Sequence, residues 1–325
     1  MTVVGISKNR QLKTLYPKRN VLAAGVCSIQ PTIDSVPWIV CPRRLLVMGR
    51  EEAGRRVHQR FAEDAVVQYA GYKRGTKLGI WSEVKMKYSA EVGETKVSLD
   101  YIFDYVLVAL GSISQYVLEE QLRVPWTRLH KIFQSGGYTI AIRDGEYFVE
   151  DCSIGYPSVI EIMTSSTSGG NKKKRTNIPL AFEDAILGKL HSAPGINYRQ
   201  VWARMASQLI AKSEIALAWG GKTIWVVQDV LVEYISKNTA LNVYQFLNTE
   251  TDEVNLLSFS YGDTYKSPKG VLDLSERELY SGPISSSTAD EPSFQDITRS
   301  AVCPPLSILI KLLAARSPMN QIIVE

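Results

Sequence analysis

Two apolar segments of β type each contain one acidic residue, and this feature restricts the fold more than any other. Asp104 lies within Ile102–Val108, and Glu161 lies within Val159–Thr164. Short runs of this kind are typical of strands at the centre of a sheet that is covered on both faces. A lone carboxylate in such a strand is destabilising unless a cation or a strong hydrogen-bond donor compensates it. The sequence therefore predicts an α/β (α+β) fold whose central mixed sheet, flanked by helices, holds two compensated acids.

The other segments predict helices and hairpins around this sheet. Apolar spacing and turn residues predict helices over 51–69, 112–122, 126–133, 197–219 and 304–315, a helix that begins at Asn177, a strand over 223–227, and hairpins over 138–148 and 242–261. We divide the chain into three parts on this basis. They are an N-terminal helical, DNA-contacting subdomain (1–75), a core (76–265) with an insertion at about 110–156, and a C-terminal extension packed on the core (266–325).

Composition excludes several classes of protein. The 325 residues contain no uncharged apolar run that could span a bilayer and no secretory signal, so we expect a cytoplasmic (bacterial) protein without membrane contact. Only three histidines are present, which argues against histidine-based nucleases and zinc hydrolases. The four cysteines are irregularly spaced, so we expect free thiols and no structural metal. The net charge of +4 is compatible with a polyanionic partner.

A polar loop at 165–177 follows the strand that contains Glu161. It carries four consecutive cations behind a Ser/Gly-rich stretch, which would place positive charge where a phosphate backbone must lie. A basic loop that is merely solvated is the alternative interpretation. The candidate DNA contacts in this loop are Ser168, Asn171, Lys172, Lys173, Lys174 and Arg175.

Phosphodiester hydrolysis without histidine requires a divalent cation, which polarises the phosphoryl group and acidifies a water molecule. Hard oxygen ligands on rigid strands hold such a cation, and Asp104 and Glu161 are the candidate pair. Strand alternation places Met163 on the same face as Glu161. The alternative is structural, with Asp104 solvated at a strand end and Glu161 paired with an arginine.

Several segments between Trp38 and Trp225 resemble the NotI-type restriction endonucleases, a family with a PD-(D/E)xK nuclease core. Trp38–Arg44 resembles the family segment W-L-V-C-P-x-R, and Phe103–Leu107 resembles its strand F-D-W-T-L. Ile160–Thr164 is similar to its strand L-E-I-Q-T. The helix from Val201 through Ala216 is similar to the next long helix of the family.

The resemblance implies that Asp104 and Glu161 are Mg²⁺ ligands and that Glu91 is an additional active-site acid. Met163 stands where the family has glutamine, and a thioether neither donates a hydrogen bond nor carries charge. Lys85 or Lys172 would then supply the missing group, or the metal alone would generate hydroxide.

The function implied by the resemblance is that of a type II restriction endonuclease. Such an enzyme acts as a homodimer on a palindromic double-stranded DNA site, and its host carries a cognate DNA methyltransferase. Two alternatives remain open at the level of the sequence. One is a structure-specific repair or recombination nuclease, and the other is a DNA-binding protein whose nuclease core has decayed at Met163.

Overall fold

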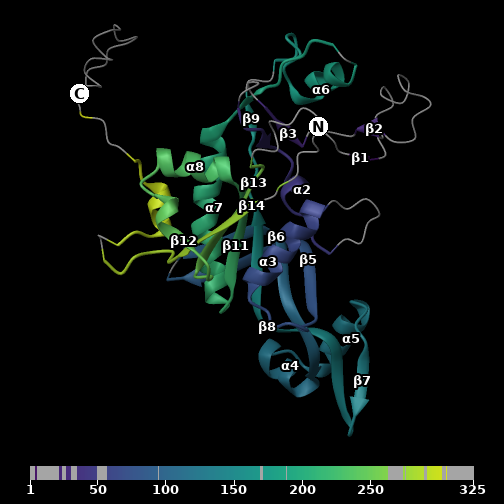
Figure 1. Ribbon diagram of the computed structural model, residues 1–325. Coiled ribbons are helices and arrows are strands. Elements are labelled where there is room, and N and C mark those ends of the chain that lie inside the picture. Colours follow the sequence, from purple (N-terminus) through teal and green to yellow (C-terminus); the bar gives the residue numbers. More distant parts are fainter. Residues whose placement is uncertain are drawn as a thin grey trace, which may run out of the picture.

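A mixed sheet of eight strands forms the centre of the molecule (Figure 1). The computed structural model describes residues 4–5, 22–23, 27–30, 35–49, 57–93, 95–168, 171–187, 189–262, 274, 276–288, 291–301 and 305. The strand order is β12-β14-β13-β11-β8-β6-β5, and β7 pairs with β8 outside this path. The strands are β5 (Leu78–Val92), β6 (Thr95–Ser114), β7 (Ile140–Arg143), β8 (Glu146–Ile162), β11 (Lys222–Gln228), β12 (Leu247–Asn248), β13 (Val254–Ser260) and β14 (Glu276–Gly282).

Parallel strands occupy the middle of this sheet and antiparallel strands its two sides. β8, β11 and β13 are parallel neighbours, whereas β6 and β5 on one side and β14 and β12 on the other are joined by antiparallel pairing. The parallel segments are covered on both faces, because six of the seven residues of β11 and four of the five β8 residues that pair with them are buried. Three two-stranded ladders lie outside the sheet, namely β1 (Val4–Gly5) with β2 (Leu22–Ala23), β3 (Ser28–Ile29) with β4 (Trp38–Ile39), and β9 (Thr167–Ser168) with β10 (Gly195–Ile196).

Helices cover both faces of the sheet because successive strand residues alternate between two apolar cores. Ile224 and Val226 face the core that contains α2 (Pro42–Leu45) and α3 (Val57–Ala70). Trp225 and Val227 face the opposite core, which is formed with α7 (Tyr198–Ala218), α8 (Asp229–Asn238), η1 (Val243–Phe246) and η3 (Phe294–Thr298). The α/β fold predicted from the sequence is therefore confirmed at the level of a mixed sheet flanked by helices.

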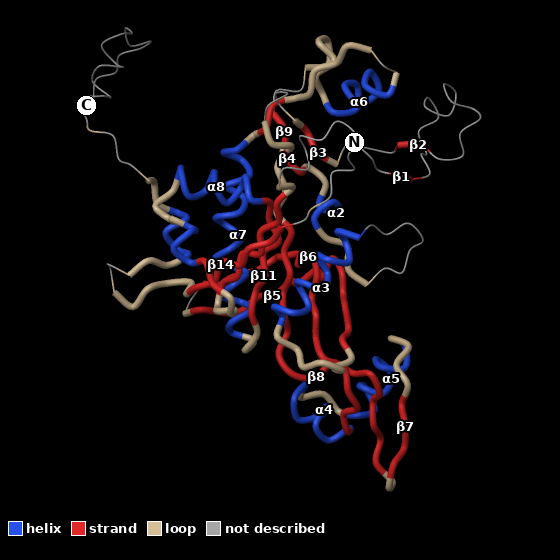
Figure 2. Tube along the Cα trace, in the orientation of Figure 1, coloured by secondary structure: helices blue, strands red, loops and turns tan. Residues whose placement is uncertain are grey.

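The predicted insertion forms a separate lobe on the ends of β6 and β8. Figure 2 shows these two strands leaving the body and running into the lobe, where α4 (Gln115–Leu122), α5 (Trp126–Ser135) and β7 lie. The lobe has an apolar cluster of its own, with Ile113, Leu118, Leu129 and Val149 buried in it. The long β6–β8 pairing continues the central sheet into this lobe.

One sequence prediction about strands is incomplete and another is wrong. The predicted hairpin over 138–148 is present, since β7 pairs with the start of β8 across the turn at Asp144 and Gly145. Its second strand is continuous with the predicted strand around Glu161, because both belong to β8, which passes through left-handed conformations at Asp151 and Gly155. Within 242–261, η1 and β12 precede β13, and both strands pair with β14 instead of with each other. Consequently the central sheet extends to Gly282, beyond the predicted core boundary at 265.

Most predicted helices are present close to their predicted positions. The predicted 51–69 helix corresponds to α3, the Asn177 start corresponds to α6 (Ile178–Ile186), and 197–219 corresponds to α7. The predicted helix over 304–315 lies outside the described residues. No helix in the described part of the chain is long and apolar enough to cross a membrane.

Candidate active site

Asp104 and Glu161 lie next to each other on neighbouring strands. The antiparallel register of β6 and β8 pairs Tyr105 with Ile160, so the two acids occupy the adjoining positions. The main-chain N–H of Ile162 donates a hydrogen bond to Asp104 Oδ2 at 2.8 Å. The two acidic residues that the sequence predicts as a pair are thus brought together at the end of β8.

Glu161 is buried, with 2% of its surface exposed, and its two carboxylate oxygens have different surroundings. Oε2 accepts a hydrogen bond from Lys212 Nζ at 2.5 Å, and the same ammonium donates to the carbonyl oxygen of Ile102 at 2.7 Å. Oε1 is also buried and has no hydrogen-bond partner among the described residues. Burial raises the pKa of Glu161 to about 7, against the opposing effect of the Lys212 ammonium.

Asp104 is half-buried, and burial raises its pKa above the ordinary value. The Ile162 hydrogen bond and the charges of Lys212 and Arg204 act in the opposite direction. A further acid, Glu83, adds to the increase. The β5–β6 register passes from Ser82–Tyr105 to Val84–Phe103, so Glu83 lies opposite Asp104, with a left-handed φ of 52°.

A cavity of about 720 Å³ opens beside the acid pair. One wall is the segment 164–167 that leaves β8, and the other is helix α7. Its complete lining comprises Val40, Pro42, Ile102, Asp104, Glu161, Ile162, Met163, Thr164, Ser165, Ser166, Thr167, Ile178, Gln200, Arg204, Gln208 and Lys212.

Helix α7 contributes a polar stripe to this cavity. Gln200, Arg204, Gln208 and Lys212 recur at intervals of four residues, which places them on one side of an α-helix. Asn197 caps the helix, and its side-chain oxygen accepts a hydrogen bond from the Gln200 N–H at 3.1 Å. The stripe was not predicted, although its four-residue spacing is present in the sequence.

Lys212 is the functional candidate that the sequence reasoning did not find. It is 4% exposed and lies in α7 one turn after the buried Leu209 and one turn before the buried Ala216. The sequence contains a signal for its burial, because position 212 falls on the apolar face of the helix. The two lysines that we predicted for this role lie elsewhere. Lys85 and Lys172 are exposed, on β5 and in the basic loop, and neither lines the cavity.

The segment Trp38–Arg44 reaches the same cavity through Val40 and Pro42. It is fixed to the end of β11 by the buried amide of Gln228, which accepts from the Ile39 N–H at 2.7 Å and donates to the Pro37 carbonyl at 2.7 Å. The Ser165 N–H donates in turn to the Ile39 carbonyl at 2.9 Å. Two segments that are far apart in the sequence thereby form one wall of the site.

Met163 lines the cavity but belongs to the apolar core. Its side chain is 4% exposed and packs in the cluster that contains Met205 and Trp225. Its main-chain N–H continues the sheet by donating to the Val226 carbonyl at 3.0 Å. The side chain of Met163, next to the acids, is therefore apolar, and the ammonium group near the acids belongs to Lys212 on α7.

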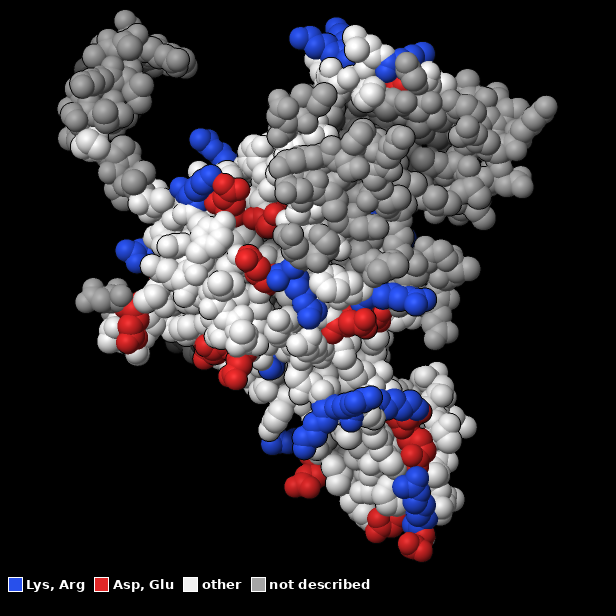
Figure 3. Space-filling model, in the orientation of Figure 1, with Lys and Arg blue, Asp and Glu red and all other residues white. Residues whose placement is uncertain are grey.

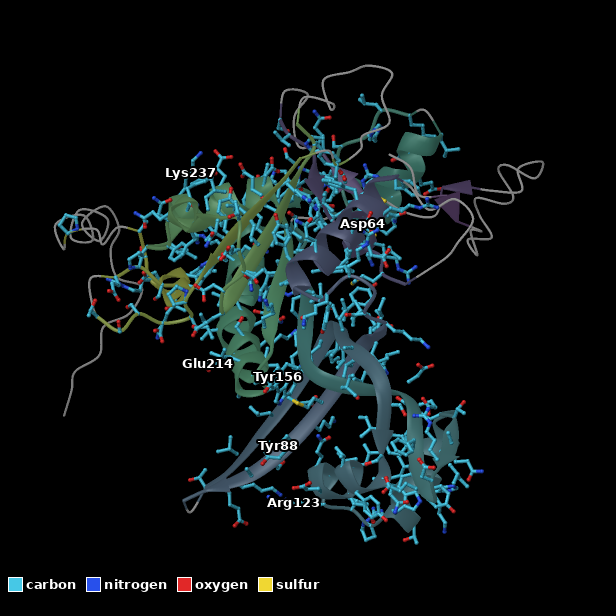
Figure 4. The ribbon with its side chains drawn as sticks, turned by 60° about the horizontal axis from the view of Figure 1, so that its bottom comes forward. Asp64, Tyr88, Arg123, Tyr156, Glu214 and Lys237 are labelled. Carbon is cyan, nitrogen blue, oxygen red and sulfur yellow. The ribbon has the colours of Figure 1, made fainter. Side chains whose placement is uncertain are left out.

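The structure does not bring Glu91 to the site. Glu91 is exposed and pairs in register with Lys96 near the tip of the β5–β6 hairpin. Eight residues of strand separate Glu91 from Glu83, which corresponds to about 26 Å. In Figure 4 this part of the hairpin projects away from the body, with Tyr88 labelled on it. Glu83, and not Glu91, is the additional acid beside Asp104.

Some polar groups of the basic loop (165–177) already interact with other groups of the protein. Arg175 forms a two-pronged ion pair with Asp184, through Nε to Oδ2 at 2.6 Å and Nη2 to Oδ1 at 2.8 Å. Asn171 Oδ1 accepts from the Lys174 N–H and so shapes the turn. Lys172, Lys173 and Lys174 are exposed, and the backbone of Ser168 belongs to β9. On the face drawn in Figure 3, Lys and Arg side chains lie at the upper end beside α6, and a longer run of them crosses the lobe at the lower end.

The described residues contain no group of three or more His, Cys, Asp or Glu side chains that could hold a metal ion. Two carboxylates are nevertheless a sufficient protein contribution for Mg²⁺, which retains water ligands and also binds substrate phosphate. No protein-family model matches the sequence, and no curated protein is significantly similar to it.

Proposed function

We propose that this protein is a magnesium-dependent, site-specific deoxyribonuclease of the type II restriction endonuclease class. The observation that carries the proposal is the buried Glu161, whose Oε1 has no partner in the described part of the chain, beside Asp104 at the edge of a polar cavity. A buried carboxylate oxygen without a partner is destabilising unless something binds it. A hard divalent cation between Asp104 and Glu161 would provide that partner.

The ion pair with Lys212 does not account for this arrangement by itself. A buried ion pair with a purely structural role is stabilising only where its remaining hydrogen-bonding atoms are satisfied. Here Oε1 of Glu161 is not satisfied, and burial outweighs the effect of the lysine, because the pKa of Glu161 remains raised. The arrangement is better explained as a site that binds a cation.

The donor set fits Mg²⁺ chemistry. Asp104 and Glu161 would hold the ion, which when bound would polarise a phosphoryl oxygen and acidify a water molecule. Lys212 keeps the Glu161 carboxylate oriented through the 2.5 Å hydrogen bond to Oε2. It also provides the cation that Met163 cannot, which favours an active nuclease over a decayed one.

DNA is the proposed substrate because cations surround the acids. Arg204 and Lys212 lie in the cavity, and the lysines of the basic loop follow the strand that carries Glu161. The mixed sheet that holds both acids is compatible with the PD-(D/E)xK core implied by the resemblance. The homodimer, the palindromic site and the companion DNA methyltransferase are parts of this proposal that rest on the resemblance alone.

The proposal is tested by incubating the purified protein with long, unmethylated linear DNA, with and without Mg²⁺. We expect discrete fragments from the wild type, and no fragments in EDTA or with Asp104→Ala or Glu161→Ala. Asp100→Asn is a matched control, because Asp100 lies on the same strand but is exposed and paired with Lys87. Intact DNA in Mg²⁺ and in Mn²⁺, whatever its methylation, would exclude cleavage of duplex DNA. Cleavage of branched DNA alone would favour the structure-specific alternative.

A further inference from the structure

Arg204 is an arginine in the wall of the candidate site. It lines the cavity, is exposed, and forms no side-chain hydrogen bond or salt bridge with the described residues. Its charge nevertheless acts on the acid pair, since it opposes the increase in the pKa of Asp104. Gln208, one turn further along α7, also lines the cavity, and its side chain forms no hydrogen bond within the described part of the chain.

The position of Arg204 differs from that of the other cation in the cavity. Lys212 lies two turns further along α7, which corresponds to about 12 Å along the helix axis, and it is already bound to Glu161 and to the Ile102 carbonyl. A polynucleotide that runs along α7 could place one phosphate at the acid pair and the next one beside Arg204, which has no partner among the described residues.

The opposite wall has hydrogen-bonding groups beside the start of α7. Asn197, the cap of this helix, donates through its N–H to the Ser166 carbonyl at 2.9 Å, so the segment 164–167 lies beside the first turn. Ser166 Oγ is buried and has no hydrogen-bond partner among the described residues. The cavity therefore offers an unpaired guanidinium and a hydroxyl away from the carboxylates, which is the chemistry that recognises a phosphodiester.

We propose that Arg204, assisted by Gln208, binds a phosphate of the nucleic-acid strand next to the one that is cleaved, so that the site requires a polynucleotide. This inference rests on the proposed nuclease function and adds a second phosphate subsite to it. A guanidinium is suited to the task because it binds phosphate oxygens with two parallel N–H groups. Arg204 is a positioning residue in this account and takes no part in the chemistry at the acid pair.

The test is the salt dependence of DNA binding, measured by fluorescence anisotropy with a labelled duplex in EDTA, so that no cleavage occurs. A plot of the logarithm of the association constant against the logarithm of the salt concentration has a negative slope. Loss of one phosphate contact reduces the magnitude of this slope by about 0.9. We expect this decrease for Arg204→Met and a slope close to the wild-type value for Arg204→Lys. Arg199→Met is the control, because Arg199 is exposed on the same helix but does not line the cavity. Its slope should equal that of the wild type.

A second readout separates positioning from chemistry. With Mg²⁺, Arg204→Met should raise KM for DNA severalfold and change kcat much less, and it should affect hydrolysis of bis(p-nitrophenyl) phosphate, which has one phosphate, less than it affects kcat/KM for DNA. An unchanged salt slope in Arg204→Met, with wild-type protein that binds DNA, would overturn the second subsite and leave the nuclease proposal standing. Wild-type protein that neither binds nor cleaves DNA would overturn both.

Discussion

At the scale of single residues, the pair formed by Glu161 and Lys212 dominates the energetics of the site. Both side chains are buried, and the desolvation of two buried charges offsets much of their mutual attraction. The raised pKa of Glu161 shows that burial outweighs the lysine. A pair of this kind contributes little net stability, so its presence is best explained by what it holds in place.

Two variants separate the contribution of the Glu161–Lys212 pair to stability from its contribution to activity. We expect Lys212→Met alone to lower the free energy of unfolding by roughly 3–5 kcal/mol at pH 8, because it leaves the Glu161 carboxylate buried without a counter-charge. The double variant Lys212→Met/Glu161→Met should regain most of that loss. Urea unfolding measures both effects. Nuclease activity should stay at least about a hundredfold below wild type in both variants. Full activity in the single variant would show that Lys212 is only structural.

The raised pKa of Glu161 predicts how the stability of the metal-free protein depends on pH. An unfolded glutamate titrates near 4.5 and the folded Glu161 near 7, so the folded state binds the extra proton between these values. The free energy of unfolding should therefore fall as the pH rises from 4.5 to 7, by about 3 kcal/mol from this group. Denaturation of the wild type and the double Met variant in EDTA measures the difference. Parallel pH curves for the two proteins would contradict the prediction.

The sequence predicts the two acids of the site but not the cation. Asp104 and Glu161 are visible because a charge in an apolar strand is conspicuous and because pairing of adjacent strands brings such residues together. Lys212 is harder to find, since a lysine in a helix is usually exposed and only the register with Leu209 and Ala216 reveals its burial. Glu91 was predicted from the family resemblance alone, whereas the register that places Glu83 opposite Asp104 is not defined by the strand pattern.

At the scale of secondary-structure elements, the β5–β6 hairpin carries part of the site at its base and extends away from the site towards its tip. Glu83 and Asp104 lie opposite each other at its base, and Glu91 lies near its tip. We expect Glu91→Ala to retain wild-type, Mg²⁺-dependent cleavage, because about 26 Å of strand separates this carboxylate from the acid pair. The same assay with Glu161→Ala provides the inactive reference. A loss of kcat in Glu91→Ala comparable to that of Glu161→Ala would contradict the placement.

The turn between α7 and β11 fixes the helix against the strand that carries Glu161. Gly221 lies in this turn, and a Cβ atom there would lie 2.0 Å from the main-chain oxygen of Pro157 on β8. We expect Gly221→Ala to lower the free energy of unfolding by roughly 1–3 kcal/mol, because backbone must move to relieve the overlap. Gly136→Ala is the control, since its added methyl would meet mainly the side chain of Tyr138. Equal thermal stability of the two variants would contradict this packing.

Elements with strong local signals were predictable, and pairings between distant elements were not. The α7 boundaries follow from the Asn197 cap and the glycines at its end. In contrast, β12 and β13 pair with β14, a strand that lies beyond this region, so 242–261 was mistaken for a hairpin.

At the scale of the whole molecule, the site and the inserted lobe lie at opposite ends of β8. Glu161 is close to the C-terminal end of this strand, where the basic loop follows, whereas the lobe with α4 and α5 is joined to its N-terminal part (Figure 1). The lobe has its own apolar core, so the site does not depend on it for burial. The acid pair, the α7 stripe and the basic loop are instead gathered at one end of the sheet.

The central claim is that Asp104 and Glu161 together bind a divalent cation, and calorimetric titration with Mn²⁺ tests it most directly. We predict one binding event per chain for the wild type and for Asp100→Asn, and no detectable binding for Asp104→Asn or Glu161→Gln. Circular dichroism would establish that the variants are folded. Wild-type protein that binds no Mn²⁺, or variants that bind it as the wild type does, would contradict the account.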